Sequence, residues 1–360
     1  MERVYNFSPG PSTLPLPVLE RVQGELLCYG STGVSVVEMS HRSKMYLEIY
    51  DEAIALLREL MDIPEDYAVL FPQGGATQQF SAVPLNLMTG SGAADYVDSG
   101  NFAHLALEEA KRYGTVNVVG SSRADNYTYV PALDKATFDP SADYFHIAVN
   151  NTIYGTRFTE LPDAGAVPLV ADMSSCILSE PYDMRRFGVM YAGAQKNIGP
   201  SGMCVLIVRK DLLGKANPLC PKLLNWQVLA DNDSMYNTPN TFAIYVAKLV
   251  FEWVLAQGGV AAMEKINIAK ANILYDYLDQ SKLFRGPVQK PFRSRMNVTF
   301  VTGDAAKDEA FIKQAAKAGL INLKGHRSVG GMRASIYNAM PAEGVRALVD
   351  AMKAFELENS

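Results

Sequence analysis

The chain has 360 residues, of which 48% are hydrophobic and 20% are charged, and its formal net charge is −5. A chain of this length and composition can bury one large core and a second, smaller one. The mild acidic excess argues against nucleic acid or an anionic membrane surface as a partner.

The N-terminal sequence contains no apolar signal core, and no apolar run approaches the roughly 18 residues that cross a bilayer. The four cysteines show no metal-type spacing and are interpreted as free thiols, with Cys176 and Cys204 in or beside apolar runs. This pattern is typical of a reducing compartment. We therefore expect a cytoplasmic protein with no membrane partner, no metal site and no disulfide framework.

The first two thirds of the chain predict a large α/β domain. Residues 1–15 are rich in turn formers and predict an irregular arm, followed by a helix that starts after Pro17. Apolar residues at helical spacing predict a second helix at 46–61. Strands are then expected at 67–71, 94–97, 116–119, 144–149, 169–171, 189–192 and 203–208, with helices after Gly74-Gly75 and at 102–113. This alternation predicts a mostly parallel sheet.

The pattern changes at Gly258-Gly259, between a helix expected at 241–256 and another at about 260–278. Beyond this break we expect strands at 296–301, 321–323 and 332–336, and helices at 308–318 and 341–356. These elements predict a small α+β domain. We therefore divide the chain into an N-terminal arm (1–15), a large domain (16–257) and a small C-terminal domain (258–360).

Lys196 lies between a strand-like run and a second apolar run, and glycines and other small residues surround it. Such a frame suits an amine inside a pocket that a flat ligand can approach. Upstream, an apolar strand ends in Asp172. This pair suggests a pyridoxal phosphate site, in which the lysine forms a Schiff base and the acid pairs with the pyridinium nitrogen. Taken singly, Lys196 could be a solvated surface lysine and Asp172 a turn cap.

The glycine turn from Gly74 to Phe80 leads from a strand into a helix. Backbone N–H groups at such a helix start, together with the Thr77 hydroxyl, can bind a phosphate. The alternative is a tight turn that serves packing only. The turn is not a P-loop, because no Gly-Lys-Ser/Thr follows.

Two further segments carry groups that suit anions. The segment from Lys324 to Ser335 holds four potential cations, and His41-Arg42 repeats its His-Arg pair, so the sequence indicates a substrate with two anionic ends. The alternative is a solvated basic loop. In the segment 237–241, Asn240 or Thr241 can cap the following helix, and Asn237 and Thr238 could donate to a phosphate.

Taken together, these residues resemble the phosphoserine aminotransferase family, in the class V group of fold-type I pyridoxal phosphate enzymes. The resemblance extends from the Asn6-to-Pro15 arm to the last helix, and is most specific at Tyr191 to Gly202, Asp211 to Asn217 and Lys324 to Pro341. It implies a large domain with a mostly parallel, seven-stranded type of sheet flanked by helices, a small α+β domain, and a homodimer with shared active sites.

The resemblance also implies roles for single residues. Lys196 would be the Schiff-base lysine and Asp172 the pyridinium partner. Further cofactor contacts would come from Ala76, Thr77, Phe102, Thr152 and Gln195 and, from the neighbouring subunit, Asn237 and Thr238. Arg333 would bind the substrate α-carboxylate. The distal phosphate or γ-carboxylate would be bound by His41, Arg42, His326 and Arg327, some of them across the dimer interface.

Two positions depart from the pattern of some bacterial members of the family. Phe102 stands where those members have a Trp stacked on the pyridine ring, and Phe can still stack. Thr77 stands where they have an Arg, which removes one contact to the substrate phosphate. The charge for that phosphate is then left to the two His-Arg pairs.

The activity that the resemblance implies is reversible amino transfer from L-glutamate to 3-phosphohydroxypyruvate. The products are O-phospho-L-serine and 2-oxoglutarate, in L-serine biosynthesis. A corresponding step on the four-carbon phosphorylated analogue, in pyridoxine biosynthesis, stays open. The alternatives are a class V aminotransferase for a non-phosphorylated oxo acid and a non-catalytic protein that binds pyridoxal phosphate or anions. A cysteine desulfurase is disfavoured, because no cysteine lies in an exposed Gly/Ser-rich loop.

Overall fold

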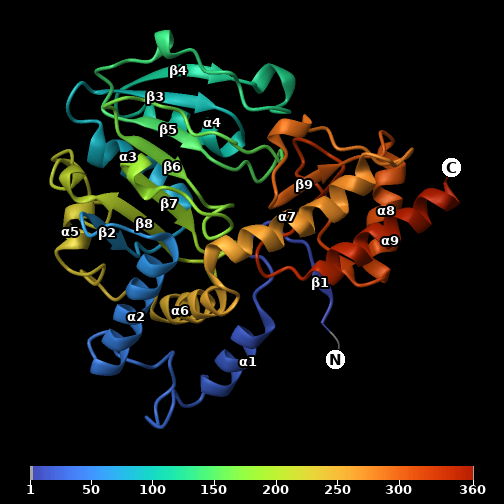
Figure 1. Ribbon diagram of the computed structural model, residues 1–360. Helices are drawn as coiled ribbons and strands as arrows, with labels where there is room; N and C mark the ends of the chain where they lie inside the picture. Colours follow the sequence, from blue (N-terminus) through green and yellow to red (C-terminus); the bar gives the residue numbers. More distant parts are fainter. Residues whose placement is uncertain (1–2, 360) are drawn as a thin grey trace.

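The computed structural model describes residues 3–359, so residues 1–2 of the predicted arm and Ser360 of the predicted small domain lie outside the described residues. One side of the molecule is built on a seven-stranded sheet, and the other on short strands and helices from the C-terminal part of the chain. Helix α7 runs between the two parts (Figure 1).

The large sheet has the strand order β2-β8-β7-β6-β5-β3-β4. Its strands are β2 (Tyr67–Leu70), β3 (Ala93–Asp98), β4 (Thr115–Ser121), β5 (Phe145–Ala148), β6 (Leu169–Asp172), β7 (Val189–Gly193) and β8 (Cys204–Arg209). Strand β8 runs antiparallel to β2 and β7, and the other neighbouring pairs are parallel. The predicted mostly parallel, seven-stranded sheet is thus confirmed.

Helices cover both faces of this sheet, which explains why its central strands are apolar along their whole length. On one face lie α3 (Gln79–Leu87), α4 (Asn101–Ala110) and α5 (Trp226–Ala230). On the other lie α2 (Lys44–Met61) and α6 (Thr241–Ala256). Helix α1 (Leu16–Glu25) packs on α6 and includes Pro17, contrary to the predicted start after this residue. Proline is tolerated there, because the first turn leaves its N–H groups unbonded anyway.

The C-terminal part contains α7 (Gly259–Leu278), α8 (Ala305–Lys317), α9 (Ala342–Glu358) and the strands β9 (Asn297–Phe300), β10 (Leu320–Ile321) and β11 (Met332–Ser335). Strands β9 and β11 are antiparallel. Short 3-10 helices occur at Ala76–Gln78 (η1), Arg123–Asp125, Lys135–Thr137, Met184–Arg186, Lys210–Leu212 and Lys290–Phe292.

The N-terminal arm is not wholly irregular, contrary to the prediction. Tyr5 and Asn6 form a short strand, β1, parallel to β10 from the far end of the chain. Phe7 is fully buried in the core formed by α7, α8, α9 and β9. The arm is therefore part of the C-terminal core before the chain enters the large domain.

No single helix within residues 3–359 is long and apolar enough to cross a membrane. Helices α6 and α7 taken together have the length and apolar composition of a membrane-spanning segment, but the chain bends by 79° at the break between them. Most side chains of α6 are buried in the protein core.

Candidate active site

Three of the predicted site residues meet at the carboxyl ends of the central strands. Asp172 is the last residue of β6, Thr152 follows β5, and Lys196 lies in the turn between β7 and β8. Asp172 stands in register with Tyr191 of β7. Because β5, β6 and β7 are parallel, their ends converge at one edge, where open α/β sheets bind ligands.

The Lys196 amine is buried among hydroxyl groups. The residue is 8% exposed. Its Nζ donates to Thr152 Oγ1 at 2.7 Å and to Ser175 Oγ at 2.9 Å, and these two oxygens are 2.6 Å apart. The ring centre of Phe102, on α4, lies 5.5 Å from Nζ. The alternative of a solvated surface lysine is therefore wrong.

Burial lowers the pKa of Lys196 to about 8, from an ordinary value of 10.5. The charges of Asp172 and Cys176 oppose this shift, whereas the charge of Arg333 adds to it. A lysine of this kind is partly neutral near pH 8, and only the neutral amine is a nucleophile or a base.

Asp172 does cap a turn, as the alternative interpretation held, and its charge also acts on the lysine. Its Oδ1 accepts a hydrogen bond from the Ser174 backbone N–H at 2.9 Å, and Ser174 Oγ accepts one from the Gly193 N–H at 3.1 Å. The carboxylate is buried, and its negative charge raises the pKa of Lys196. The turn-cap interpretation is therefore confirmed, and the pairing of Asp172 with a pyridinium nitrogen stays a prediction.

The N-terminal arm covers the lysine turn. Ser12 Oγ donates to the Lys196 carbonyl at 2.6 Å, and the Ser12 N–H donates to the Gln195 carbonyl at 3.0 Å. At Gly10, whose φ is +144°, an added Cβ would lie within 3.3–3.4 Å of the side chains of Gln195 and Lys196. Sequence reasoning did not assign this contact to Ser12, because nothing local in the arm indicates which distant turn it touches.

The glycine turn enters its helix through one 3-10 turn, η1, which lies against β7. Gly75 occupies the N-cap position and no side chain caps the turn, so its first N–H groups are free to bind an anion. Ala76 and Thr77 follow directly, and Thr77 is exposed.

The segment 237–240 lies beside this same glycine turn. Gln73 Nε2 donates to the Thr238 carbonyl at 2.7 Å, and Asn240 Nδ2 donates to the Gly202 carbonyl at 3.3 Å. Asn240 Oδ1 also accepts from the Ala243 N–H at 3.1 Å, which confirms its predicted role as the N-cap of α6. A reach of Asn237 and Thr238 into a neighbouring subunit stays a prediction.

Arg333, on β11, brings a buried positive charge to the site. It is 6% exposed, its Nη1 donates to the Thr152 carbonyl at 3.3 Å, and its Nε has no partner among the described residues. Burial lowers its pKa. A buried guanidinium with an unused N–H is suited to an anionic ligand.

The two His-Arg pairs lie in different surroundings. Burial and the charges of Arg333 and Arg327 lower the pKa of His326, so this pair lies near the Arg333 charge. His41 and Arg42 precede α2 and bond to each other at 3.4 Å. Within residues 3–359, no hydrogen bond or ion pair joins His41 or Arg42 to Lys196, Thr152 or Arg333. A role of this pair in a site, of its own chain or of a neighbouring subunit, stays a prediction.

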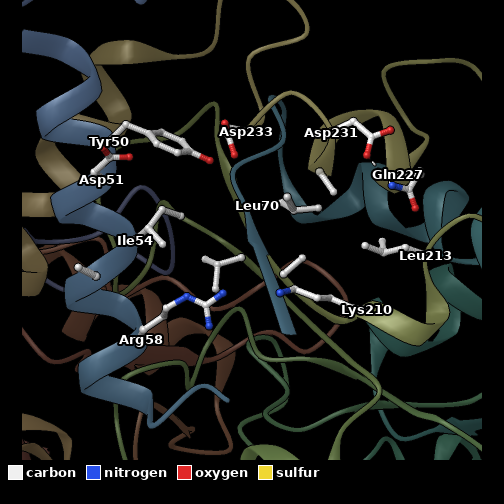
Figure 2. A pocket seen from close by; sticks show the side chains of 14 residues that line it. Tyr50, Asp51, Ile54, Arg58, Leu70, Lys210, Leu213, Gln227, Asp231 and Asp233 are labelled. Carbon is white, nitrogen blue, oxygen red and sulfur yellow. Dashed lines mark hydrogen bonds between the residues drawn. The ribbon is translucent and has the colours of Figure 1, made fainter. Parts of the chain in front are cut away.

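A cavity of about 640 Å³ lies elsewhere, between α2, β2 and α5 (Figure 2). Arg58 of α2 and Lys210 approach it from opposite sides, with Asp231 and Asp233 further along. Its lining includes no predicted site residue, and the Arg58 guanidinium already donates to the carbonyls of residues 63, 64 and 67.

Comparison with known proteins agrees with this geometry. Residues 4–348 match the model of the family "Aminotransferase class-V". The chain is 55% identical to the phosphoserine aminotransferase of Bacillus cereus (strain ATCC 10987 / NRS 248) over 359 residues, covering 100% of each chain. It superposes on the phosphoserine aminotransferase of Bacillus circulans subsp. alkalophilus with a TM-score of 0.97 at 45% identity, covering 100% of both chains. For the PLP-bound phosphoserine aminotransferase of Trichomonas vaginalis, the TM-score is 0.93 at 42% identity, covering 98% of this chain and 100% of the other.

Proposed function

Since the chain belongs to the aminotransferase class-V family, we propose that it is a phosphoserine aminotransferase with pyridoxal phosphate as its cofactor. It transfers the amino group of L-glutamate to 3-phosphohydroxypyruvate, giving 2-oxoglutarate and O-phospho-L-serine. The observation that carries this proposal is the buried Lys196 amine, held between two hydroxyls beside the partly unpaired guanidinium of Arg333.

The residues present fit this cofactor. The buried Gln195 Oε1 and Arg333 Nε have no partner among the described residues, and η1 is uncapped, so groups for a polar, phosphorylated ligand are in place. When bound, pyridoxal phosphate supplies an aldehyde carbon and a ring that accepts negative charge from the substrate. It would be held by Ala76, Thr77, Phe102, Thr152, Asp172, Gln195 and Lys196, with Asn237 and Thr238 from a neighbouring subunit.

Each side chain then has a separate task. Lys196 would move the proton between the substrate Cα and the aldehyde carbon (C4′) of the cofactor, for which a pKa near 8 is suited. Asp172 would keep a proton on the ring nitrogen, and Phe102 would cover the ring and exclude water.

Arg333 binds and orients the α-carboxylate. His326 and Arg327 bind the distal phosphate or γ-carboxylate. The same donors serve both anions, because Arg and His donate equally well to phosphate and carboxylate oxygens.

A homodimer with shared sites is part of the proposal. In such a dimer, His41 and Arg42, which bond to each other at 3.4 Å, would complete the site of the partner. A cytoplasmic location is also proposed, and is supported by the four cysteines, which are all free.

The test uses the protein with its cofactor. It should absorb visible light, and L-glutamate should bleach this absorbance. Turnover should be much faster with 3-phosphohydroxypyruvate than with pyruvate or glyoxylate, and a competition assay with the four-carbon phosphorylated oxo acid measures the second substrate. Lys196→Ala should abolish turnover, and full turnover in this variant would refute the assignment. Failure to bleach with any amino donor would favour a non-catalytic binding protein.

A further inference from the structure

Helix α7 presents two fully buried polar side chains to the C-terminal core. Asn267 is 0% exposed and Lys270 is 1% exposed, and they lie one turn apart on the same side of the helix. Lys270 Nζ donates to the carbonyls of Tyr337 at 2.7 Å and Met340 at 3.1 Å. Lys270 therefore binds the turn 337–340, and so does Asn267, through Asn338. This turn joins β11, the strand of Arg333, to α9.

This turn also reaches the lysine. The Asn338 N–H donates to Asn197 Oδ1 at 3.0 Å, and Asn197 is the neighbour of Lys196 in the chain. Asn338 Nδ2 donates to the Leu178 carbonyl at 2.9 Å. The segment 175–178 begins with Ser175, which accepts from the Lys196 amine. Asn338 thus bonds to both segments whose side chains meet at the Lys196–Ser175 hydrogen bond.

Asn267 closes the connection from α7. Its Nδ2 donates to Asn338 Oδ1 at 2.8 Å and to the Ser179 carbonyl at 3.1 Å. Leu178 is held at φ +61°, a conformation that costs free energy for leucine and persists only where its surroundings impose it. Asn338 holds the carbonyl of Leu178 itself and Asn267 holds the carbonyl of the next residue, Ser179, and these bonds supply that constraint.

Stability alone does not account for the Lys270 amine. Among residues 3–359 no ion pair joins its Nζ to a carboxylate, and burial lowers its pKa to about 7. A buried amine without a charged partner is less favourable than an apolar side chain of the same length. What it contributes is two directed hydrogen bonds that fix the carbonyls of one turn.

We propose that Lys270, Asn267 and Asn338 are positioning residues for Lys196. They fix the position of the Lys196 turn relative to the Ser175 turn, so that the amine faces Thr152 and Ser175. The proposal rests on the proposed function, in which Lys196 moves a proton. None of the three bonds to the amine itself.

The variants that test this are Lys270→Met and Asn338→Ala, with Lys248→Met as the matched control. Lys248 is a buried lysine of the neighbouring helix α6, 4% exposed, and it pairs with Glu52 and Glu252 rather than with the 337–340 turn. Melting curves establish that each variant is folded. If Lys270→Met does not fold, Asn338→Ala and Asn267→Leu carry the test.

Two readouts are needed. In the holoenzyme, losing these bonds should lower kcat about tenfold while the KM for L-glutamate stays within about twofold, because Arg333 keeps its place. In cofactor-free protein, the rate at which a small acylating reagent labels Lys196, followed by mass spectrometry over pH, reports the pKa of the amine. Its midpoint should rise from about 8 toward the ordinary 10.5, because water reaches a loosened amine.

Unchanged kcat and an unchanged labelling midpoint in a folded variant would overturn the proposal. An equal shift in Lys248→Met would also overturn it, since general destabilisation would then explain the effect. The two levels of inference stay distinguishable. A parent protein without transaminase activity refutes the proposed function, whereas the labelling midpoint tests the positioning role whatever the activity.

Discussion

Replacing Lys196 by methionine should abolish turnover and, at the same time, stabilise the cofactor-free protein at neutral pH. Methionine is an apolar side chain of similar length, so the change removes the amine and leaves the site filled. The buried amine is a cost to the folded state, because its pKa is lowered from 10.5 to about 8. The activity of the enzyme is therefore expected to oppose its stability at this position.

The size of the stability difference follows from the lowered pKa of Lys196. Each pKa unit corresponds to about 1.4 kcal/mol, so the protonated amine costs the folded state about 3 kcal/mol below pH 8. The variant also loses two hydrogen bonds, to Thr152 and Ser175, but these hydroxyls remain bonded to each other. Allowing about 1 kcal/mol for this loss, Lys196→Met should be more stable by about 2 kcal/mol at pH 7.

The pH dependence has a definite sign. The folded pKa of Lys196 lies below the unfolded one, so between about pH 8 and 10.5 the unfolded parent chain binds more protons than the folded one. Parent stability therefore rises with pH in this window, relative to a variant that lacks the group. The advantage of Lys196→Met should be constant below pH 8 and shrink above it.

Urea unfolding of both cofactor-free proteins, at equal protein concentration and at several pH values from 7 to 10.5, measures this difference. Lys270 and the buried tyrosines titrate in both proteins, so their contributions cancel in the difference between the two stabilities. A stability difference that does not change with pH would refute the reasoning, as would one that grows as the pH rises.

Two further predictions concern substrate binding and the role of the cysteines. In steady-state assays, Arg333→Ala should raise the KM for L-glutamate and for 3-phosphohydroxypyruvate by roughly 10- to 100-fold, because the variant loses a pair of charge-assisted hydrogen bonds to the carboxylate. An unchanged KM would show that Arg333 does not bind the carboxylate. Cys176→Ala should retain transamination and release no sulfide from cysteine, because burial raises the pKa of this thiol and leaves it unreactive. Loss of a sulfide-releasing activity in that variant would instead support a desulfurase.

The sequence predicted those parts of the fold that local pattern controls. The apolar strands of the large sheet and the helix at 241–256 were predicted with ends close to the observed ones, because burial on both faces leaves continuous apolar runs. Lys196 and Asp172 were recognisable because Asp172 ends a strand and Lys196 follows one. The pairing of β1 with β10 was not predictable, since two residues of strand carry no pattern and the partner is remote in the chain.

Other site residues were missed for a chemical reason. Ser175 follows Asp172 closely, in a strand-end turn of small polar residues, and a hydroxyl in such a turn has many ordinary roles. What identifies Ser175 as a site residue is its hydrogen bond with the lysine amine, and only the three-dimensional structure shows this bond. Lys270 stands in an amphipathic helix, where a lysine predicts a solvated face, and here tertiary contacts place it inside.

The pairing of the first strand with β10 also sets an order of events during synthesis. Tyr5 and Asn6 leave the ribosome long before their partners, Leu320 and Ile321, which lie more than 300 residues later in the chain. The seven-stranded sheet can form in the meantime, because its strands all lie before residue 210. The β1–β10 pair cannot form until residues 320–321 have emerged, so the arm that carries Ser12 onto the Lys196 turn gains this second anchor late. Complete anchoring of the arm over the Lys196 turn is thus a late event in the maturation of a new chain.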